Sequence, residues 1–521
     1  MKLLLGVLAV FLVAGCRSES HPGGPDGAPP PGDGRPDTGP PEIDAPNPDG
    51  VTITPGAADR ILLLGTVVTP AVTLDGAVLV EGNAITCVDT AATCTAAPGA
   101  AGATIIDTKG IISPGLIDTH NHILFDIFDN DDWGPAQLYM DHDQWPAEPR
   151  YIAMLDVKQC LADDSQGKPA WCVPAGYGTS ATSLRCEMDK FGELKGLISG
   201  TTSIVGLPGT SAGCFGSIAR SIDVAQNELP MDNVQTSALF PPSDPNGVCA
   251  NYANGKTKAF LVHAGEGLDA KALGEFAKLG TSTTTPNCLY APQTAITHGT
   301  AFTKTELDQM GAAGMKLIWS PQSNVTLYGN TADIPTALAS GVTVAIAPDW
   351  SMGGSQNMLD ELRFGDAWDD AHWNNLLTPQ DLVTMGTAHA AQALALDGQL
   401  GSLAVGHLAD ISVYAGDRAH PFDAILAAKP KTVRLVMVGG VVLYGDQGLR
   451  SAGPASPGCE ELDVCGTSKF LCVATSDSSN KLDQTFVQIA TVLGTALDAA
   501  DAATPGDGFT FAPLPPLVHC D

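Results

Sequence analysis

The feature that most constrains the fold is an alternation of short apolar strands with helical segments across residues 111–397. Residues 260–262 precede a helical pattern over 268–279, and residues 295–297 precede another over 305–313. The change from a twofold to a 3.6-residue hydrophobic period marks each strand-then-helix unit. Repetition of such units predicts parallel strands, and at this length it favours a parallel α/β barrel.

Strand patterns also stand on both sides of the predicted barrel. Short strand-like runs separated by turn residues lie between 57 and 110, and two more such runs lie at 401–414 and 433–443. Alternating apolar residues bounded by Gly, Asn and Asp are typical of antiparallel strands. The sequence therefore predicts one antiparallel strand unit that the barrel divides into two flanking segments, 57–110 and 398–450.

The N-terminal region predicts an exported protein. Residues 1–16 combine one lysine, a short apolar core and small residues before Cys16, as in a signal peptide. Residues 12–16 resemble the lipobox of bacterial lipoproteins, which implies lipidation of Cys16 and a membrane-anchored protein of the cell envelope. A plain secretory signal is the alternative. Residues 17–56 are rich in Pro, Gly and Asp, and we expect a disordered tether there.

The cysteine content agrees with export. Setting Cys16 aside leaves twelve of the 13 cysteines, an even number that suits structural disulfides in an oxidising compartment. Cys87 and Cys94 are close enough for a local bridge, and further cysteines gather near residues 160–186. The segment 451–521 carries four more and is predicted to be a small cysteine-rich extension.

Net charge excludes one class of partner. At a formal charge of -31 the chain offers no basic surface to neutralise phosphates, so nucleic-acid binding is not expected. A small-molecule substrate is the predicted partner, and the sequence predicts no particular oligomeric state.

Side chains that can bind a metal stand at the ends of several predicted barrel strands, where barrel active sites lie. These residues are His120, His122, His263, His298 and Asp349. The first two are separated by one residue, and alternate side chains of an extended segment share a face. Imidazole and carboxylate groups together suit zinc or another first-row divalent ion.

With these residues assembled, the chain resembles the amidohydrolase superfamily, in the branch that holds cytosine deaminase and the triazine aminohydrolases and chlorohydrolases. The resemblance runs from about Ile61 to Gly445. In chain order, its motifs are residues 114–118 with His120 and His122, 194–205, 263–266, His298, 320–324, Asp349, 361–363 and 401–414.

The resemblance implies a (β/α)8 barrel with a composite β-sandwich and one divalent metal ion, zinc, with iron or manganese as alternatives. Matched by position, the metal ligands are His120, His122, His263 and Asp349. Glu266 matches the acid that shuttles protons, and His298 matches the histidine that faces the substrate and the water at the metal.

General chemistry gives these residue types a role. A divalent metal supplies a hydrolytic nucleophile at neutral pH by acidifying water. Asp349 can accept its proton, Glu266 can protonate a leaving nitrogen, and His298 can stabilise developing charge. The sequence therefore predicts a hydrolase of non-peptide C–N bonds that deaminates an amino-heterocycle; a hydrolase of amides or cyclic amides and a catalytically silent tethered binding protein are the alternatives.

Two further patterns refine this prediction. Two-metal members resemble this chain but carry a bridging lysine on the fourth strand, and no lysine lies between Lys195 and Lys256, which favours one metal. The long segment 129–186 is predicted to be a lid or pocket insertion after the first strand. Five other histidines, among them His142, are interpreted as structural or surface residues. Glu361 is predicted to lie on a supporting helix, and Trp319, Tyr328 and Trp350 are assigned to a pocket or to packing.

Overall fold

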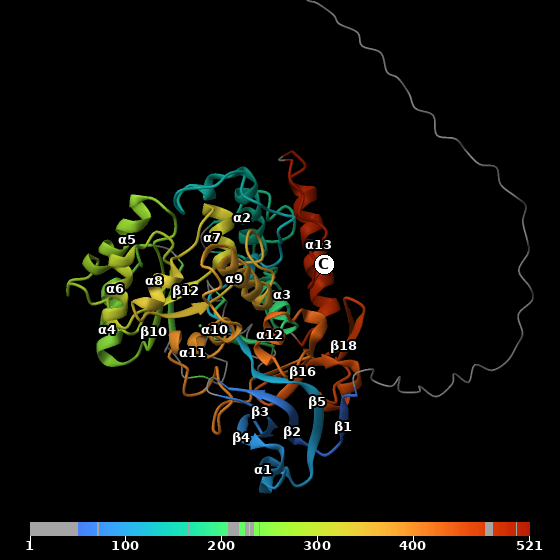
Figure 1. The fold of residues 1–521 in the computed structure, drawn as a ribbon. Coiled ribbons are helices and arrows are strands. Elements are labelled where there is room, and N and C mark those ends of the chain that lie inside the picture. Colours follow the sequence, from blue (N-terminus) through green and yellow to red (C-terminus); the bar gives the residue numbers. More distant parts are fainter. Residues whose placement is uncertain are drawn as a thin grey trace, which may run out of the picture. The chain divides into compact units, whose positions relative to one another are not determined.

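The computed structural model describes residues 50–69, 72–164, 167–206, 218–223, 229, 234–238, 240–474, 483–506 and 508–520. The predicted signal peptide, Cys16 and nearly all of the tether lie outside the described residues. By its contacts the chain divides into Met1–Ala45 and Pro46–Asp521, and every element described below belongs to the second unit. That unit has a mixed α/β fold (Figure 1).

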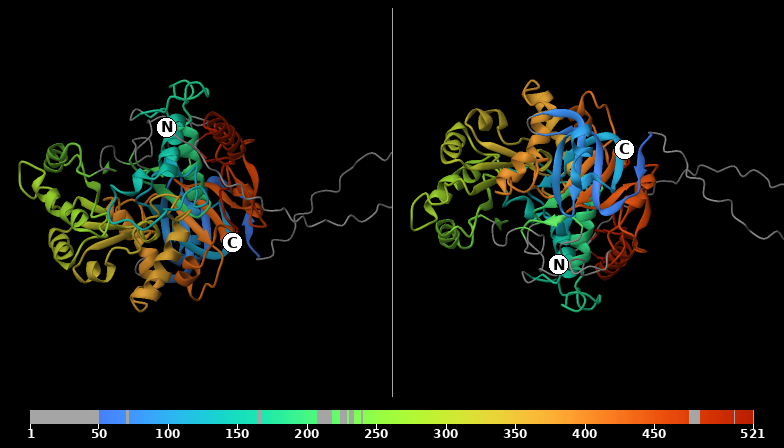
Figure 2. Two further views of the ribbon diagram at one scale, coloured as in Figure 1. Left: turned by 90° about the horizontal axis from the view of Figure 1, so that it is seen from above. Right: turned by 90° about the horizontal axis from the view of Figure 1, so that it is seen from below.

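Strands from both ends of the described chain form one ten-stranded sheet. Its order is β17-β18-β16-β15-β14-β5-β2-β3-β4, and β1 pairs with β5 off this path. The strands are β1 (Thr52–Thr54), β2 (Ala57–Val68), β3 (Thr73–Glu81), β4 (Ala84–Thr90), β5 (Ala103–Pro114), β14 (Ile411–Tyr414), β15 (Val433–Val438), β16 (Val441–Asp446), β17 (Glu460–Val464) and β18 (Thr467–Leu471). In the view from below in Figure 2, the blue N-terminal strands lie beside the orange and red C-terminal ones.

Two predicted boundaries of this β unit are wrong. The sheet begins at β1, inside the segment 17–56 that was expected to be tether, because Val51 is buried and Ile53 packs against an apolar cluster. The extension 451–521 is also not separate from the sheet, since β17 and β18 add to its edge. Phe470 and Leu471 of β18 are fully buried there.

The parallel strands form two further sheets. A five-stranded sheet contains β9 (Val234–Ser237), β10 (Ala259–Ala264), β11 (Thr294–His298), β12 (Lys316–Trp319) and β13 (Thr343–Ile346), and a three-stranded one contains β6 (Leu116–Asp118), β7 (Thr201–Ile204) and β8 (Arg220–Ser221). Every pairing in both sheets is parallel. A parallel bridge between Asn121 and Asp349 brings the chain after β6 against the chain after β13. Within the described ranges, no pairing joins β8 to β9.

Helices separate the parallel strands, as the alternation predicted. β10 is followed by α5 (Ala270–Thr281) and β11 by α6 (Lys304–Ala313), which confirms the two strand-helix units named above. The other helices are α1 (Ala91–Thr95), α2 (Pro149–Leu161), α3 (Arg185–Leu197), α4 (Pro245–Asn254), α7 (Pro321–Tyr328), α8 (Ile334–Ala339), α9 (Met358–His372), α10 (Pro379–Met385), α11 (Ala388–Ala393), α12 (Pro421–Leu426) and α13 (Phe486–Ala503). By length and composition α13 could cross a membrane, alone among the described helices, and one face of it, with Leu493 and Leu497, packs into the main apolar core.

The first predicted barrel strand is two strands. The apolar run 110–118 was expected to lead straight to the histidine pair, yet β5 ends at Pro114 in the ten-stranded sheet and β6 begins at Leu116 beside β7. At Gly115, between them, an added Cβ would lie 2.2 Å from Thr202 Oγ1, so only glycine lets the chain pass so close to β7. The parallel-strand unit therefore begins at Leu116 rather than at residue 111.

Disulfides stabilise the described loops. The predicted Cys87–Cys94 bridge is present. The other bridges among described residues are Cys160–Cys172, Cys249–Cys288, Cys459–Cys472 and Cys465–Cys520, and Cys186 is also disulfide-bonded. The two C-terminal bridges hold the ends of β17 and β18 and the final residues of the chain, which confirms structural use of these cysteines.

Candidate metal centre and active site

The structure brings the four predicted metal ligands together. His120 and His122 follow β6, His263 belongs to β10, and Asp349 follows β13. Asp349 Oδ1 lies 2.8 Å from His120 Nε2 and 3.5 Å from His122 Nε2. The rings of His120 and His263 are centred 4.6 Å apart. Residues from three distant parts of the sequence therefore converge on one point.

The donor atoms suit a cation. His120 is fully buried and Asp349 is 2% exposed, yet among the described residues His120 Nδ1 makes no hydrogen bond, and His120 Nε2 and Asp349 Oδ1 meet only in the 2.8 Å ion-pair contact given above. Orphaned buried polar atoms are costly unless another group satisfies them. Two ligands each about 2.1 Å from one ion lie roughly 3 to 3.5 Å apart, close to the separations seen here. These residues fit a divalent metal.

The protonation states are those that a metal needs. Burial lowers the pKa of His122 to about 3 and holds the pKa of His263 well below its usual range, so both rings are neutral at physiological pH. Burial opposes ionisation of Asp349, but the neighbouring histidines, His120 above all, hold its pKa below the usual range. Neutral imidazole and ionised carboxylate are the metal-binding forms.

Backbone contacts fix the ligands. The His122 amide donates to the Asp349 carbonyl (2.6 Å), and the Asp349 amide donates to the His120 carbonyl (3.0 Å). His298 and Asp349 have φ angles of 72° and 74°, in the left-handed region that few residues other than glycine adopt. Such strain persists where surrounding contacts determine the geometry, and it is common at functional sites.

Two contacts orient ligands from outside the centre. The Ser237 carbonyl, at the end of β9, lies 3.1 Å from His263 Nδ1, which therefore carries the proton and leaves Nε2 free for the metal. The Ser323 hydroxyl in α7 donates to Asp349 Oδ2 at 2.6 Å. This bond aims Oδ1 at the histidines.

The predicted acid, Glu266, lies at the same centre. It follows β10, and its Oε2 is 3.8 Å from His298 Nε2, while Oε1 accepts a 2.7 Å hydrogen bond from the Tyr328 hydroxyl. Burial is the main cause that raises the pKa of Glu266 to about 7. A carboxyl group with this pKa can both give and take a proton near neutral pH.

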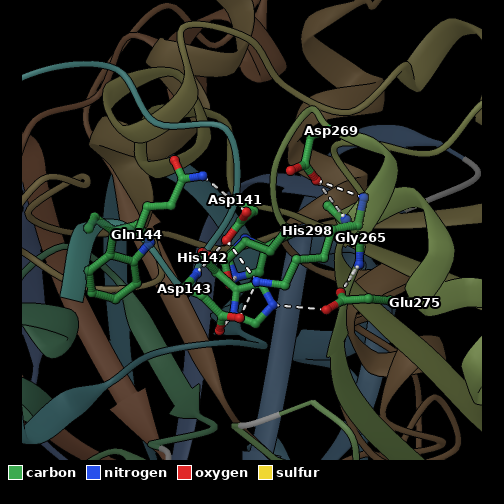
Figure 3. Close-up of polar contacts among 12 residues, drawn as sticks. Asp141, His142, Asp143, Gln144, Gly265, Asp269, Glu275 and His298 are labelled. Atoms are coloured by element: carbon green, nitrogen blue, oxygen red, sulfur yellow. Dashed lines mark hydrogen bonds and ion pairs between the residues drawn. The ribbon is translucent and has the colours of Figure 1, made fainter. Parts of the chain in front are cut away.

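The insertion 129–186 reaches this acid from two sides. Trp145 Nε1 donates to the Tyr328 hydroxyl (3.0 Å), and the His142 amide donates to the Glu266 carbonyl (3.3 Å). The His142 ring was interpreted as structural, and it pairs with Glu275 at 2.9 Å while the Gly265 amide donates to the same carboxylate (Figure 3). The bond to Glu275 raises the pKa of His142 to about 9. The insertion is thus anchored on the loop that carries Glu266.

Aromatic side chains border the metal centre. The Trp350 ring is centred 5.5 Å from that of His122 and 5.3 Å from that of Trp145. Trp133 and Tyr151 continue the cluster at 6.0 Å and 6.4 Å from Trp350. Of the three aromatics assigned to a pocket or to packing, Trp350 lies beside the predicted ligand His122 and Tyr328 contacts Glu266.

Sequence reasoning missed the roles of α7 and of Trp145. Residues 320–324 were noted as a motif, but no chemistry was assigned to Ser323 or Asn324. Glu361 lies on α9 as predicted, is fully buried, and accepts a hydrogen bond from the Gln322 amide of α7 (3.3 Å). Its pKa is raised to about 8 by burial. The helix that supplies Ser323 is therefore itself braced by a buried carboxyl group.

Comparison with known proteins agrees with this arrangement. Residues 247–443 match the model of the amidohydrolase family. A 5-methylthioadenosine/S-adenosylhomocysteine deaminase of Syntrophobacter fumaroxidans is 30% identical over 173 residues, which are 31% of this chain and 39% of the relative. A 5'-deoxyadenosine deaminase of Methanothermobacter thermautotrophicus is 23% identical over 71% of this chain and 90% of its own length. The chain thus spans about two fifths of the first relative and most of the second.

Solved structures share the fold. A triazine hydrolase variant superimposes with a TM-score of 0.57 at 15% identity, over 83% of this chain and 99% of its own. Atrazine chlorohydrolase of Arthrobacter aurescens TC1, solved with zinc, gives a TM-score of 0.51 at 17% identity, over 76% and 96%. Residues 247–443 are thus similar to the amidohydrolase family, much of the chain is similar to deaminases, and the solved structures share its fold.

Proposed function

We propose that this protein is a metal-dependent hydrolase of C–N bonds that removes ammonia from an amino-heterocycle. The observation that carries the proposal is the convergence of His120, His122, His263 and Asp349 on one point, with Glu266 and His298 beside it. The family match and the deaminase relatives support the same reaction class.

The residues divide the work of replacing an amino group by oxygen. A bound divalent ion would acidify a water molecule and so supply the nucleophile. Glu266, with a pKa of about 7, holds a proton that it can deliver to the leaving nitrogen. His298 faces Glu266 across the centre and can hydrogen-bond the ring atom on which charge develops. The overall reaction converts the amino-heterocycle and water into the oxo-heterocycle and ammonia.

The proposed cofactor is one zinc ion, held on a (β/α)8 barrel. A set of three imidazoles and one carboxylate suits zinc, and the chlorohydrolase of similar fold was solved with zinc. A second, bridged metal needs a lysine on the fourth parallel strand. Here that strand is β9, with the sequence Val-Gln-Thr-Ser, and its last carbonyl is already bonded to His263.

The aromatic cluster around Trp350 supports a planar substrate. Trp350 lies next to His122, and Trp145, Trp133 and Tyr151 of the insertion pack against Trp350, so a heterocycle at the metal centre can pack face to edge with this cluster. The relatives named above are deaminases of adenosine-type compounds, so aminopurines join aminotriazines and aminopyrimidines as the proposed substrates.

A substrate panel tests the proposed reaction. Zinc-loaded protein is incubated with aminopurines, aminotriazines, aminopyrimidines, lactams and N-acyl amino acids, and ammonia and ring products are measured. We expect ammonia release from at least one amino-heterocycle, abolished in the double variant H120A/H122A. Turnover confined to the lactams or N-acyl compounds would contradict deamination.

We also propose that the protein is exported and anchored to a cell-envelope membrane by lipid on Cys16. The support is the lipobox-like sequence at residues 12–16 and the disulfides of the described chain, which need an oxidising compartment. Replacing Cys16 by Ala should move the full-length protein from the membrane fraction to the soluble fraction of the envelope. Continued membrane association of this variant would overturn the anchor.

A further inference from the structure

A chain of four buried side chains leads from the β12 strand to the active-site histidine. The Trp319 indole donates to Thr331 Oγ1 (2.7 Å), and the Thr331 hydroxyl donates to Asn324 Oδ1 (3.2 Å). The Asn324 amide nitrogen lies 2.9 Å from His298 Nδ1. All four residues are buried, with Thr331 the most exposed at 5%. We call this chain the tautomer relay.

The direction of every bond in the relay follows from its first member. An indole N–H can only donate, so Thr331 Oγ1 accepts from Trp319 and is free to donate its own proton to Asn324. This bond assigns the acceptor end of the Asn324 amide to Thr331 and turns the NH2 group toward His298. His298 Nδ1 must then be the acceptor, without a proton of its own.

The reverse arrangement is less favourable. If Asn324 turned its oxygen toward a protonated Nδ1, its NH2 group would face Thr331, which would then accept from both sides. Among the contacts of the described chain, no acceptor would remain for the Thr331 hydroxyl proton. A buried donor left without a partner costs roughly 1–3 kcal/mol, so the first arrangement is preferred.

We propose that Trp319, Thr331 and Asn324 are positioning residues that lock His298 in its Nε2–H tautomer, so that it serves the reaction as a hydrogen-bond donor. The inference deepens the proposed function and rests on it for the catalytic consequence alone. An imidazole ring always carries at least one N–H group, so with Nδ1 accepting from Asn324 the proton of His298 lies on Nε2.

The relay also assigns His298 a different role from the other histidines. By distance, His298 groups with His120 and His263 as a possible ligand set. Its Nδ1 is occupied by Asn324, and a protonated Nε2 has no lone pair for a metal. His263 shows the opposite pattern, because Nδ1 is bonded to the Ser237 carbonyl and Nε2 is left free. The surroundings thus make His263 a ligand and His298 a donor.

The direct test is ¹⁵N NMR of the zinc-loaded full chain with ¹⁵N-labelled histidine, in which the His298 signals are assigned by their loss in the H298N variant. The proposal predicts a protonated Nε2 and an unprotonated Nδ1 in the wild type. In N324D, a carboxylate accepts from both Thr331 and His298, so Nδ1 should carry a proton. A wild-type ring protonated at Nδ1, or coordinated to zinc through Nε2, overturns the proposal.

Two variants of Thr331 provide a second test if N324D does not fold. T331V removes the hydroxyl that orients Asn324, whereas T331S keeps it. We expect T331S to retain the wild-type tautomer and T331V to show a mixture; identical wild-type spectra for both would contradict the relay.

Turnover measurements distinguish failure of the tautomer relay from failure of the proposed deamination reaction. With a substrate found in the panel, N324D should lose about 10²- to 10⁴-fold in kcat with a much smaller change in KM, since one donor in the transition state is lost. An Nε2–H wild type without turnover on any compound would leave the relay intact and refute the proposed reaction. A wild-type protein that turns over substrate with its His298 proton on Nδ1 would refute the relay and leave the proposed reaction intact.

Discussion

Replacing Glu266 by Gln should lower kcat by about 10²- to 10⁴-fold, the usual contribution of a general acid or base. The amide keeps the shape of the carboxyl group and can still accept the hydrogen bond from Tyr328, but it cannot deliver a proton. Zinc content should stay at the wild-type level because Glu266 is not among the converging ligands. The measurements are steady-state kinetics and metal analysis of the same preparation.

The matched control is Y328F, which removes the hydrogen bond to Glu266 and leaves the acid in place. It should lose far less activity than E266Q. Full activity in E266Q would refute the proton-transfer role, and loss of zinc in E266Q would mean that this carboxyl group is a ligand.

E266Q also tests whether the pKa of Glu266 is raised in the folded protein. Folded Glu266 keeps its proton up to pH of about 7, whereas the unfolded chain loses it near its ordinary pKa of 4.5. The folded state therefore binds more protons between these values, and this group makes the free energy of unfolding fall as pH rises through the window, by about 3 kcal/mol in total. In metal-free protein with intact disulfides, the free energy of unfolding of E266Q should not show this decrease of about 3 kcal/mol with rising pH. Parallel pH profiles for the two proteins would contradict a raised pKa of Glu266 in the folded state.

Replacing Asp349 by Asn should remove metal and activity together. Asp349 Oδ1 lies 2.8 Å from His120 Nε2 and 3.5 Å from His122 Nε2, and its charge would offset that of the cation. Asn tolerates the left-handed backbone at this position, so the fold should survive where Ala would add strain. We expect kcat/KM to fall by at least about 10³-fold, because loss of the metal removes the nucleophile.

The matched variant with a smaller expected effect is S323A. It leaves the Asp349 carboxylate in place but removes the hydroxyl that donates to Oδ2. Loss of such an outer contact should weaken metal affinity or activity by about 10- to 100-fold. A D349N protein that binds zinc as tightly as the wild type and turns over substrate would show that Asp349 is not a ligand.

The grouping of the candidate site residues was predictable because the ends of strands fix the direction of their side chains. His263 and His298 each end or nearly end a parallel strand, and parallel strands deliver their last residues to the same edge of the sheet. Residue type and position in the strand therefore sufficed to group them with Asp349. The strand-helix units containing β10 and β11 followed from periodicity in the same way.

The supporting residues were not predictable in this manner. Ser323, Asn324 and Tyr328 lie on one short helix, and the sequence does not state which way that helix turns its faces; the packing of α7 against α9 and the buried Glu361 decides it. Similarly, the path of the chain at Gly115 depends on its approach to Thr202 of β7, a contact with a residue far along the chain. Strand β18 joins the sheet by pairing with β16, and β17 pairs with β18, which local composition does not reveal.

The most direct test of the central claim joins metal content to turnover on one wild-type preparation. Ammonia release from the best amino-heterocycle of the panel is measured before chelation, after chelation, and during stepwise return of zinc. The account predicts that turnover falls to about 1% or less without metal and returns in proportion to zinc, reaching a plateau near about one ion per chain. Turnover that survives complete metal removal, or a protein that binds less than about half an equivalent of zinc, iron or manganese, would contradict it.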